Sequence, residues 1–522
     1  IYVRELFKLF FPNINSFKSV LNETDNTSIS RERFIDFLKT SGLLLLIINS
    51  YLFLTVTKSG GEYIISNLST TSESFMTISW FTIGMSLFIF SMGFNNLIAW
   101  YSNVGRDGSQ WNYLVDRINA LIGPVLVWII AITVSLNILL NLNMIPDFLT
   151  TFEDGVISSV EFSLWPLWLV SINLVMVMFA PFTIYIHKKY PYLSMTIFVI
   201  LIILIDSLNF PINLAYIKVF NYLFFWLTIH QIGYFYADGK LQLIRKNIFP
   251  AVSIISYGYL YYQLSVNKLF LSFSSYRLSE INNEDPPTTV YFVATIGLLS
   301  LLFSVKNIIE KVLNNNYLWK VFSILHSNIY TLYLWHLIVV LSIYLFDLPK
   351  HIGILYLLAA VLIFGNYERS VFRLSSNLLK RVNPLQPWPS PIKARFSIGN
   401  FSLAWVSALL VLLGIIHLTL GGVGQNGFFN LREFYFMRSN TFEGMGRIIT
   451  GILLLNVTVR GLMYKKRILF VSVMFTIFSL YSRIIIDENI TYFEYGFSFF
   501  LILLFLVLLL PKRNYKLVSK VK

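Results

Sequence analysis

Apolar segments of roughly 18 or more residues recur along the whole chain and limit the folds open to it. A helix needs about 20 apolar residues to cross some 30 Å of bilayer hydrocarbon at about 1.5 Å per residue. Only 13% of the 522 residues are charged, whereas a soluble domain usually carries about 25%. The sequence therefore predicts an integral membrane protein and leaves no room for a large soluble domain.

Hydropathy along the chain predicts an all-α polytopic transmembrane helix bundle with about 14 spans. We find no internal repeat, so the inverted-repeat pattern of many transporters is not evident. The spans are expected near residues 40–57, 75–99, 119–140, 162–186, 191–208, 212–237, 246–265, 288–305, 322–346, 351–366, 401–421, 446–463, 467–486 and 493–511.

A basic linker at 367–400 contains four prolines, which interrupt a continuous helix. We therefore expect about ten spans before the linker and about four after it. The predicted parts are a cytosolic N-terminal segment (1–36), a ten-span core (37–366), the linker (367–400), a four-span membrane module (401–511) and a basic cytosolic tail (512–522).

The net charge of +14 comes from short Lys and Arg clusters that fall between alternate apolar spans. By the positive-inside rule, this asymmetry places both termini in the cytosol. Topology thus explains the charge, and no nucleic-acid partner is predicted. The absence of cysteine excludes disulfides, thiolate metal sites and a cysteine nucleophile. The histidines and carboxylates show no metal-ligand spacing, so no metal is predicted.

Charged side chains within hydrocarbon cost about 2.5–3.5 kcal/mol each, so each one is a candidate for function. In the first span Arg33, Asp36 and Lys39 recur every three residues and share one helix edge. Asn49 lies about three turns deeper. The three charged residues either bind a substrate or form a local ion pair at a helix end. Arg117, ahead of the third span, either holds a phosphorylated donor or only sets orientation.

Two histidines lie inside predicted spans. His230 occupies the sixth span, and His336 lies in the ninth, three residues after Tyr333 and on the same face. A neutral histidine in such a place is either a general base or a hydrogen-bonded packing residue. Trp165 and Trp168, at the end of the fourth span, are typical of membrane-interface anchors.

Five stretches together resemble the membrane acyltransferase 3 family, over about residues 30–367. The last of them, YTLYLWH, is the most specific. The module at 401–511 is similar to a small four-span membrane family of unknown function. The five stretches are Arg33, Asp36 and Lys39; the glycine-rich second span leading to Arg117 and Pro124; PLWLVSINLVMVMFAPF at 166–182; HQIGYFYADG at 230–239; and YTLYLWH at 330–336.

The chain departs from the family in its first span. The family usually carries a histidine there, commonly treated as the acid–base residue, where this sequence has Asn49 and Ser50. Neither side chain is a general base near neutral pH. The arginine-rich motif that the family carries after the second span also has fewer basic residues in this chain. Either another residue, His230 or His336, takes the catalytic role, or the chain has lost the chemistry.

The resemblance implies a bacterial cytoplasmic-membrane O-acyltransferase. It would move an acyl group, with acetyl expected first, from cytosolic acyl-CoA to a hydroxyl of an envelope sugar or lipid. Acyl-CoA is then a donor substrate, no bound cofactor is expected, and membrane lipids surround the chain. The expected base is His336 or His230, supported by Tyr333 or Asn49. The expected substrate-binding residues are Arg33, Asp36, Lys39, Arg117 and Trp168.

A second interpretation keeps the fold without the chemistry, as a transporter or a lipid-binding protein. The missing first-span histidine and the extra four-span module favour it. It predicts that His230 and His336 matter only for stability, whereas an enzyme needs at least one of them for turnover. A third interpretation is a scaffold for an envelope assembly.

Overall fold

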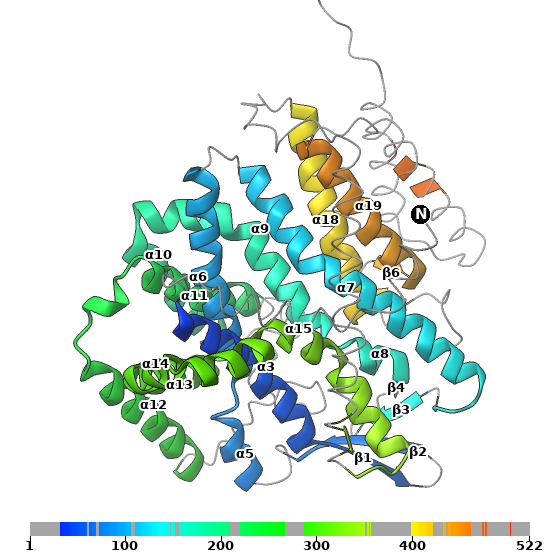
Figure 1. Cartoon of the computed structure of the whole chain (residues 1–522), viewed down its shortest axis with the longest axis horizontal. Helices are drawn as coiled ribbons and strands as arrows, with labels where there is room; N and C mark the ends of the chain where they lie inside the picture. The colour runs from blue at the N-terminus through cyan, green and yellow to red at the C-terminus, as the bar shows by residue number, and fades with distance from the viewer. Residues whose placement is uncertain are drawn as a thin grey trace, which may run out of the picture. The chain divides into compact units, whose positions relative to one another are not determined.

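The computed structural model describes a mostly helical chain (Figure 1). Its described residues divide into two compact units, one within 1–107 and 120–386 and the other within 108–119 and 387–522. The domain boundaries expected at 366 and 400 stay predictions, since most of the linker lies outside the described residues. Those residues are 32–59, 62–68, 73–105, 110–146, 148–151, 156–208, 220–266, 287–349, 352–353, 355, 398–420, 432–434, 437–439, 441–460, 472–473, 476–477 and 502.

Helices form most of the first unit. The longest among them are apolar along most of their length, as the hydropathy analysis predicted. They are α3 (Arg33–Phe53), α5 (Glu73–Ser79), α6 (Gly84–Gly105), α7 (Gln110–Asn141, shared with the second unit), α8 (Ser159–Leu164), α9 (Leu167–Lys189), α10 (Pro191–Ser207), α11 (Phe220–Ala237), η2 (Leu241–Leu243), α12 (Ile248–Ser265), α13 (Thr289–Ser304), α14 (Lys306–Leu313) and α15 (Asn316–Leu345).

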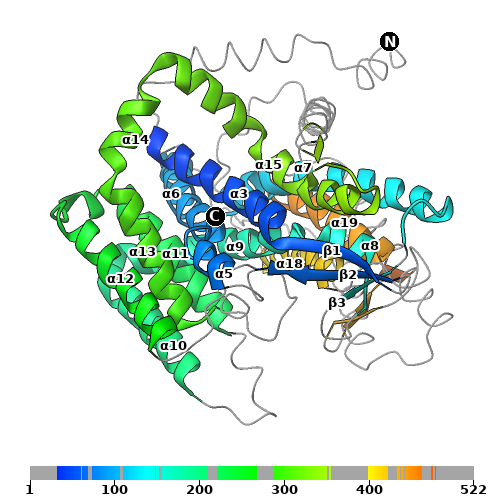
Figure 2. The same cartoon turned by 90° about the horizontal axis from the view of Figure 1, so that it is seen from below.

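A four-stranded sheet follows α3 and defines what we call the sheet end of the first unit (Figure 2). β1 and β2 pair antiparallel, as do β3 and β4, whereas β2 and β3 run parallel with Ile64 opposite Thr150. The loop after α3 and the loop after α7 therefore meet at one end of the helices. The strands, in sheet order, are β1 (Leu54–Ser59), β2 (Glu62–Asn67), β3 (Phe148–Thr151) and β4 (Val156–Ser158).

The chain is mostly helical, as the predicted all-α bundle requires, but this sheet adds strands that the sequence analysis did not predict. The first span was expected at 40–57, but α3 ends at Phe53 and the chain continues as β1. LTVTKS begins with alternating apolar and polar side chains, and both LTVTKS and EYIISN contain β-branched residues, which favour strands. A hydropathy window averages over this alternation, so it merged the strand with the span before it.

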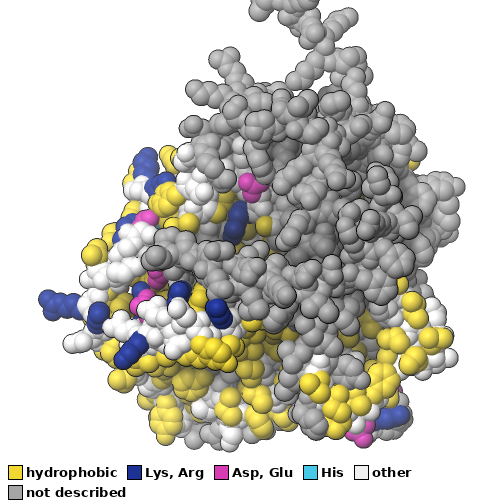
Figure 3. Space-filling model, viewed as in Figure 1, with side chains coloured by type: hydrophobic (Ala, Val, Ile, Leu, Met, Phe, Trp, Pro, Cys, Tyr) yellow, Lys and Arg dark blue, Asp and Glu magenta, His cyan; other side chains and the backbone are white. Residues whose placement is uncertain are grey.

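The opposite end of the first unit, where α3 begins, is held by polar contacts and is called the basic end. Tyr236, in the last turn of α11, donates to Glu32 Oε1 (2.5 Å) just before α3. The same hydroxyl accepts from Lys306 Nζ (2.7 Å) at the start of α14. Figure 3 shows Lys and Arg side chains gathered in one area beside a broad hydrophobic surface. Such a division is typical of a helix bundle with one charged rim.

Glycines let α6 approach two neighbouring helices closely. A Cβ added at Gly42 of α3 would lie only 2.6 Å from the carbonyl oxygen of Gly84. A Cβ added at Gly93 would overlap the backbone of His230 in α11. Small residues at helix interfaces are common in membrane bundles. The glycines of the second span thus allow close helix approach on two sides of α6.

Asp206 joins two helices at the sheet end. Its Oδ2 accepts from the backbone N–H of Thr289, at 2.8 Å, where α13 begins. Thr288 caps the same helix by accepting from the N–H of Tyr291 (3.2 Å). A carboxylate beside a helix N-terminus is electrostatically favourable, so Asp206 links α10 to α13.

The described residues contain four helical segments long and apolar enough to cross a membrane, or five if one bent pair forms a single span. The bent pair, Thr289–Ser304 and Lys306–Leu313, turns by 56°. The protein is therefore a helical membrane protein by length and composition, but the expected total of about 14 spans is not confirmed. Much of the expected spans at 467–486 and 493–511 lies outside the described residues. The four long segments are Arg33–Phe53, Ser74–Gly105, Phe162–Lys189 and Asn316–Leu345.

The second unit contains helices α18 (Ile398–Leu420) and α19 (Thr441–Arg460) and the strand pair β5 (Arg432–Phe434) and β6 (Met437–Ser439). The two helices touch through a glycine. A Cβ added at Gly451 would lie 2.6 Å from the carbonyl oxygen of a residue in α18. The expected four-span composition of this part stays a prediction.

Candidate functional site

Ser50 of α3 and His336 of α15 meet inside the first unit and are here called the deep pair. Both side chains are buried, with 0% and 1% of their surface exposed. His336 Nε2 lies 2.9 Å from Ser50 Oγ, and Nδ1 contacts the backbone carbonyl oxygen of Tyr333. At about 1.5 Å per residue, Ser50 lies some 25 Å along α3 from Arg33. The deep pair is therefore near the sheet end, far from the basic end.

The contacts of His336 fix where its proton lies. A carbonyl oxygen only accepts, so Nδ1 of a neutral ring must carry the proton and donate it to Tyr333. Nε2 is then bare and accepts from the Ser50 hydroxyl. If the ring is protonated on both nitrogens, Nε2 donates instead, and the hydroxyl proton turns to the carbonyl oxygen of Leu46, 3.0 Å away. The deep pair thus has the geometry of a base beside a hydroxyl.

Polar atoms next to the deep pair are incompletely paired. Asn49 Nδ2 donates to the carbonyl oxygen of Thr82 (3.1 Å), but Asn49 Oδ1 has no hydrogen-bond partner among the described residues. An unsatisfied buried polar atom costs about 1–3 kcal/mol. The Tyr333 ring stacks on His336 with centroids 5.1 Å apart. Of the four predicted catalytic residues, His336 and Tyr333 lie together here, whereas Asn49 is the chain neighbour of Ser50 and its amide contacts Thr82.

His230, the fourth predicted catalytic residue, lies elsewhere, in the contact between α6 and α11. Its Nε2 is 2.9 Å from Asn96 Nδ2, and its ring meets the edge of Tyr234. The Tyr234 hydroxyl in turn lies 3.0 Å from Thr183 Oγ1. With Gly93 packed against its backbone, His230 is part of the close helix contact. This placement favours packing, one of the two roles left open for it by the sequence.

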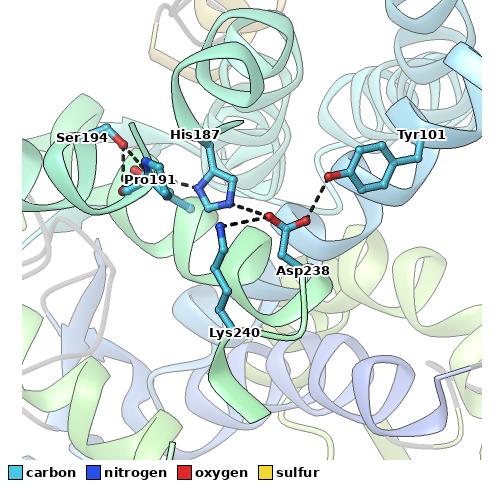
Figure 4. A network of polar contacts seen from close by, with 7 residues as sticks. Tyr101, His187, Pro191, Ser194, Asp238 and Lys240 are labelled. Carbon is cyan, nitrogen blue, oxygen red and sulfur yellow. Dashed lines mark hydrogen bonds and ion pairs between the residues drawn. The ribbon is translucent and has the colours of Figure 1, made fainter. Parts of the chain in front are cut away.

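A second group of polar residues, not predicted as a site, lies at the basic end and is here called the basic-end network (Figure 4). Asp238 is its centre: Oδ1 accepts from the Tyr101 hydroxyl (2.9 Å), and Oδ2 lies 3.2 Å from His187 Nε2 and 3.3 Å from Lys240 Nζ. Burial opposes ionisation of Asp238, but hydrogen bonds from Tyr101, Lys240 and His187 outweigh it and hold its pKa below the ordinary value. The carboxylate is therefore stabilised in its charged form.

The other side of His187 is held by Gln231. Gln231 Nε2 lies 3.3 Å from His187 Nδ1 and also donates to Ser194 Oγ (2.6 Å) and the Pro191 carbonyl oxygen (3.1 Å). An amide nitrogen only donates, so Nδ1 accepts and Nε2–H of a neutral ring donates to Asp238. Both nitrogens of His187 are thus occupied. The network joins the ends of α6, α9 and α11 with the start of α10, which follows α9 directly, so spacing along a single helix gave no signal for it.

The predicted donor-binding residues of the first span are engaged within the protein. Arg33 donates to the carbonyl oxygen of Leu313 (2.6 Å) and lies over the Trp319 ring, 4.6 Å from its centroid. Asp36 Oδ1 is 3.4 Å from His326 Nε2. These contacts are made with α14 and α15 and do not decide between the two interpretations that the sequence left open. Binding of a donor by Arg33, Asp36 and Lys39 stays a prediction.

Two predicted binding residues remain, Trp168 in the first unit and Arg117 in the second. Trp168 packs edge-on against Trp226 with centroids 6.4 Å apart. Arg117 belongs to the second unit, where it lies one turn from Tyr113 on α7. A shared donor site of Arg117 with the first span stays a prediction. Within the described ranges, no group of three or more histidines and carboxylates could hold a metal ion.

The observations so far define the class: a mostly helical membrane protein with a buried serine–histidine pair and a charged network at one end. Comparison with family models, curated proteins and solved structures gives no match. The function is therefore inferred from the residues of the protein and their geometry.

Proposed function

We propose that the protein is a membrane O-acyltransferase in which His336 is the general base. The reaction moves an acyl group, acetyl in the first instance, from acyl-CoA to a hydroxyl of a sugar or lipid. The observation that carries this proposal is the Nδ1 contact of His336 with the Tyr333 carbonyl oxygen. That contact leaves Nε2 as the proton acceptor, pointed at a hydroxyl on α3.

The deep pair also bears on the histidine that this chain lacks when its first span is compared with the acyltransferase 3 pattern. The family's first-span histidine is replaced here by Asn49 and Ser50. In this chain α15 supplies an imidazole to that level of α3, because His336 Nε2 lies 2.9 Å from Ser50 Oγ. His336 belongs to the YTLYLWH stretch that itself resembles the family, and it places an imidazole beside the first span although the first-span histidine is missing. This supports an enzyme over a fold that has lost its chemistry.

The proposal includes an orientation in a bacterial cytoplasmic membrane, with about 14 spans and both termini in the cytosol. The basic end, with Lys188, Lys240 and Lys306, would face the cytosol and the acyl-CoA pool. The sheet end would face the envelope, where the acceptor is found. Acyl-CoA carries phosphates, which Lys and Arg bind well.

The test is transfer of labelled acetyl from acetyl-CoA by the full-length protein in lipid nanodiscs. Wild type is expected to release CoA and to acetylate an added sugar or lipid acceptor. His336→Ala, compared at equal folded yield, is expected to lose about 10²- to 10⁴-fold in rate, the usual effect of removing a general base. If wild type releases no CoA with any acceptor in a panel, the proposal is wrong, and movement of a lipid or solute becomes the working hypothesis.

A further inference from the structure

We infer that Ser50 is a nucleophile that carries the acyl group as a seryl ester between the two half-reactions. This inference rests on the proposed function, but it adds a covalent intermediate and a residue that the sequence did not predict as catalytic. It stands on the contact between Ser50 Oγ and His336 Nε2 and on the nearly complete burial of both side chains.

Proton positions support this role. A serine is a weak nucleophile until a base accepts its proton, and a third group usually orients the base. Here the Tyr333 carbonyl oxygen orients His336, and His336 Nε2 accepts from Ser50. When the ring has taken the proton, Nε2 donates. The pair therefore serves both the loss and the return of the hydroxyl proton.

A second hydroxyl–imidazole contact exists in α3, and its surroundings differ. Thr40 Oγ1 lies 2.7 Å from His326 Nδ1, and Asp36 lies beside Nε2 of the same ring. The His326 and Asp36 side chains are 13% and 14% exposed, so water reaches them. An ester survives longer where water is excluded. Thr40 itself is 1% exposed, so the difference lies in the imidazole partner, and the buried His336 favours Ser50 over Thr40 as the acyl carrier.

Unsatisfied polar atoms on Asn49 and Tyr51, the chain neighbours of Ser50, support a polar ligand at this level of α3. Asn49 is 2% exposed, and its Oδ1 has no hydrogen-bond partner among the described residues. The Tyr51 hydroxyl, on the other side of Ser50 in the chain, likewise has none among them. An amide oxygen can accept from an acceptor hydroxyl or from the amide groups of the pantetheine arm of CoA. A bound substrate would remove the cost of leaving it unpaired.

Each half-reaction is balanced. In the first, Ser50 Oγ attacks the thioester carbonyl carbon and its proton moves to His336 Nε2. The Oγ–C bond forms, the C–S bond breaks, and the leaving sulfur takes the proton from Nε2 to give free CoA. In the second, the acceptor hydroxyl attacks the seryl ester and gives its proton to Nε2. The Oγ–C bond breaks, and Ser50 Oγ takes the proton back.

The experiment uses the full-length protein in lipid nanodiscs with labelled acetyl-CoA and no acceptor. The reaction is quenched with acid, the chain is digested, and labelled peptides are identified by mass spectrometry. Wild type is expected to show a burst of CoA, close to one per protein, and acetyl on Ser50. Ser50→Ala is expected to lose the label and to slow transfer by at least about 10²-fold.

A matched control is available on α6. Ser91 is also fully buried and donates to the carbonyl oxygen four residues earlier, as Ser50 can. Ser91→Ala is expected to keep both the label and the rate, so a general effect of losing a buried serine is distinguished from loss of a nucleophile. Ser50→Cys gives a second test, because the chain has no other cysteine. Its label is expected as a thioester, which neutral hydroxylamine releases, unlike the serine ester.

The outcomes separate the two proposals. Acetyl on Ser50 of wild type, chased into an added acceptor, supports the inference. If wild type transfers acetyl but the label is on Thr40 or elsewhere, or if Ser50→Ala keeps its rate within about threefold, Ser50 is not the carrier, while the acyltransferase proposal stands. If wild type neither releases CoA nor transfers acetyl, the proposed function fails and this inference fails with it.

Discussion

The deep pair and the basic-end network each contain a buried histidine, but the two rings are placed differently. His187 has a donor on one side, Gln231, and a carboxylate on the other, Asp238. His336 has a carbonyl oxygen on one side and a hydroxyl on the other. In the first arrangement the partners hold the ring between them. In the second arrangement, the His336 ring faces the Ser50 hydroxyl, which can donate its proton to the ring. The partners of a buried histidine, more than its burial, thus indicate whether it is structural or reactive.

The same substitution at both histidines tests this comparison most strongly. Glutamine keeps polarity and similar size but cannot take a proton near neutral pH. His336→Gln is expected to lower acetyl transfer by about 10²- to 10⁴-fold, while His187→Gln keeps the rate. CoA release by folded protein of equal yield measures both. An equal loss in the two variants would contradict the assignment of His336, and not His187, as the reactive ring.

The next effect concerns stability at the basic end. Asp238→Asn removes the charge that accepts from Tyr101, His187 and Lys240. Hydrogen bonds to a charged group contribute about 1.5–3 kcal/mol each when buried, and partial exposure of Asp238 lowers that figure. We expect a loss of about 2 kcal/mol, seen as a lower thermal midpoint in detergent. Ser50→Ala is the comparison and is expected to change the midpoint less.

The stabilisation from Asp238 also depends on pH. Its folded-state pKa lies below the ordinary value of 3.8, so the stabilisation is complete above the unfolded-state pKa. It is lost as pH falls through the folded-state pKa. The difference in thermal midpoint between wild type and Asp238→Asn should therefore be constant near neutral pH and shrink below about pH 4. A difference that grows on acidification would mean that the carboxylate is not held in its charged form.

The smallest expected effect is at the edge of the basic-end network. Ser194→Ala removes one neutral hydrogen bond from Gln231, whose amide retains the Pro191 carbonyl oxygen as an acceptor. The cost should be about 1 kcal/mol of stability with no change in acetyl transfer. Thermal unfolding and the CoA assay on the same preparation measure the two quantities. A loss of transfer would connect the network to the reaction and weaken the contrast with the deep pair.

Composition and periodicity determined the class of protein and part of its packing. Long apolar runs need a membrane, and the glycine-rich second span became a helix that packs closely on its neighbours. His336 and Tyr333 were predicted to be neighbours because residues three apart share a helix face. These properties are local, so they can be read along the chain.

The tertiary structure decided what each polar residue contacts. Ser50 meets His336 across 286 positions of sequence, and His187 meets Asp238 across 51. The parallel pairing of β2 with β3 likewise joins two distant loops. Hydrogen bonds depend on which helix ends and faces are brought together in space, and one sequence does not specify that order. For this reason the candidate base could be named from the sequence, whereas its serine partner required the fold.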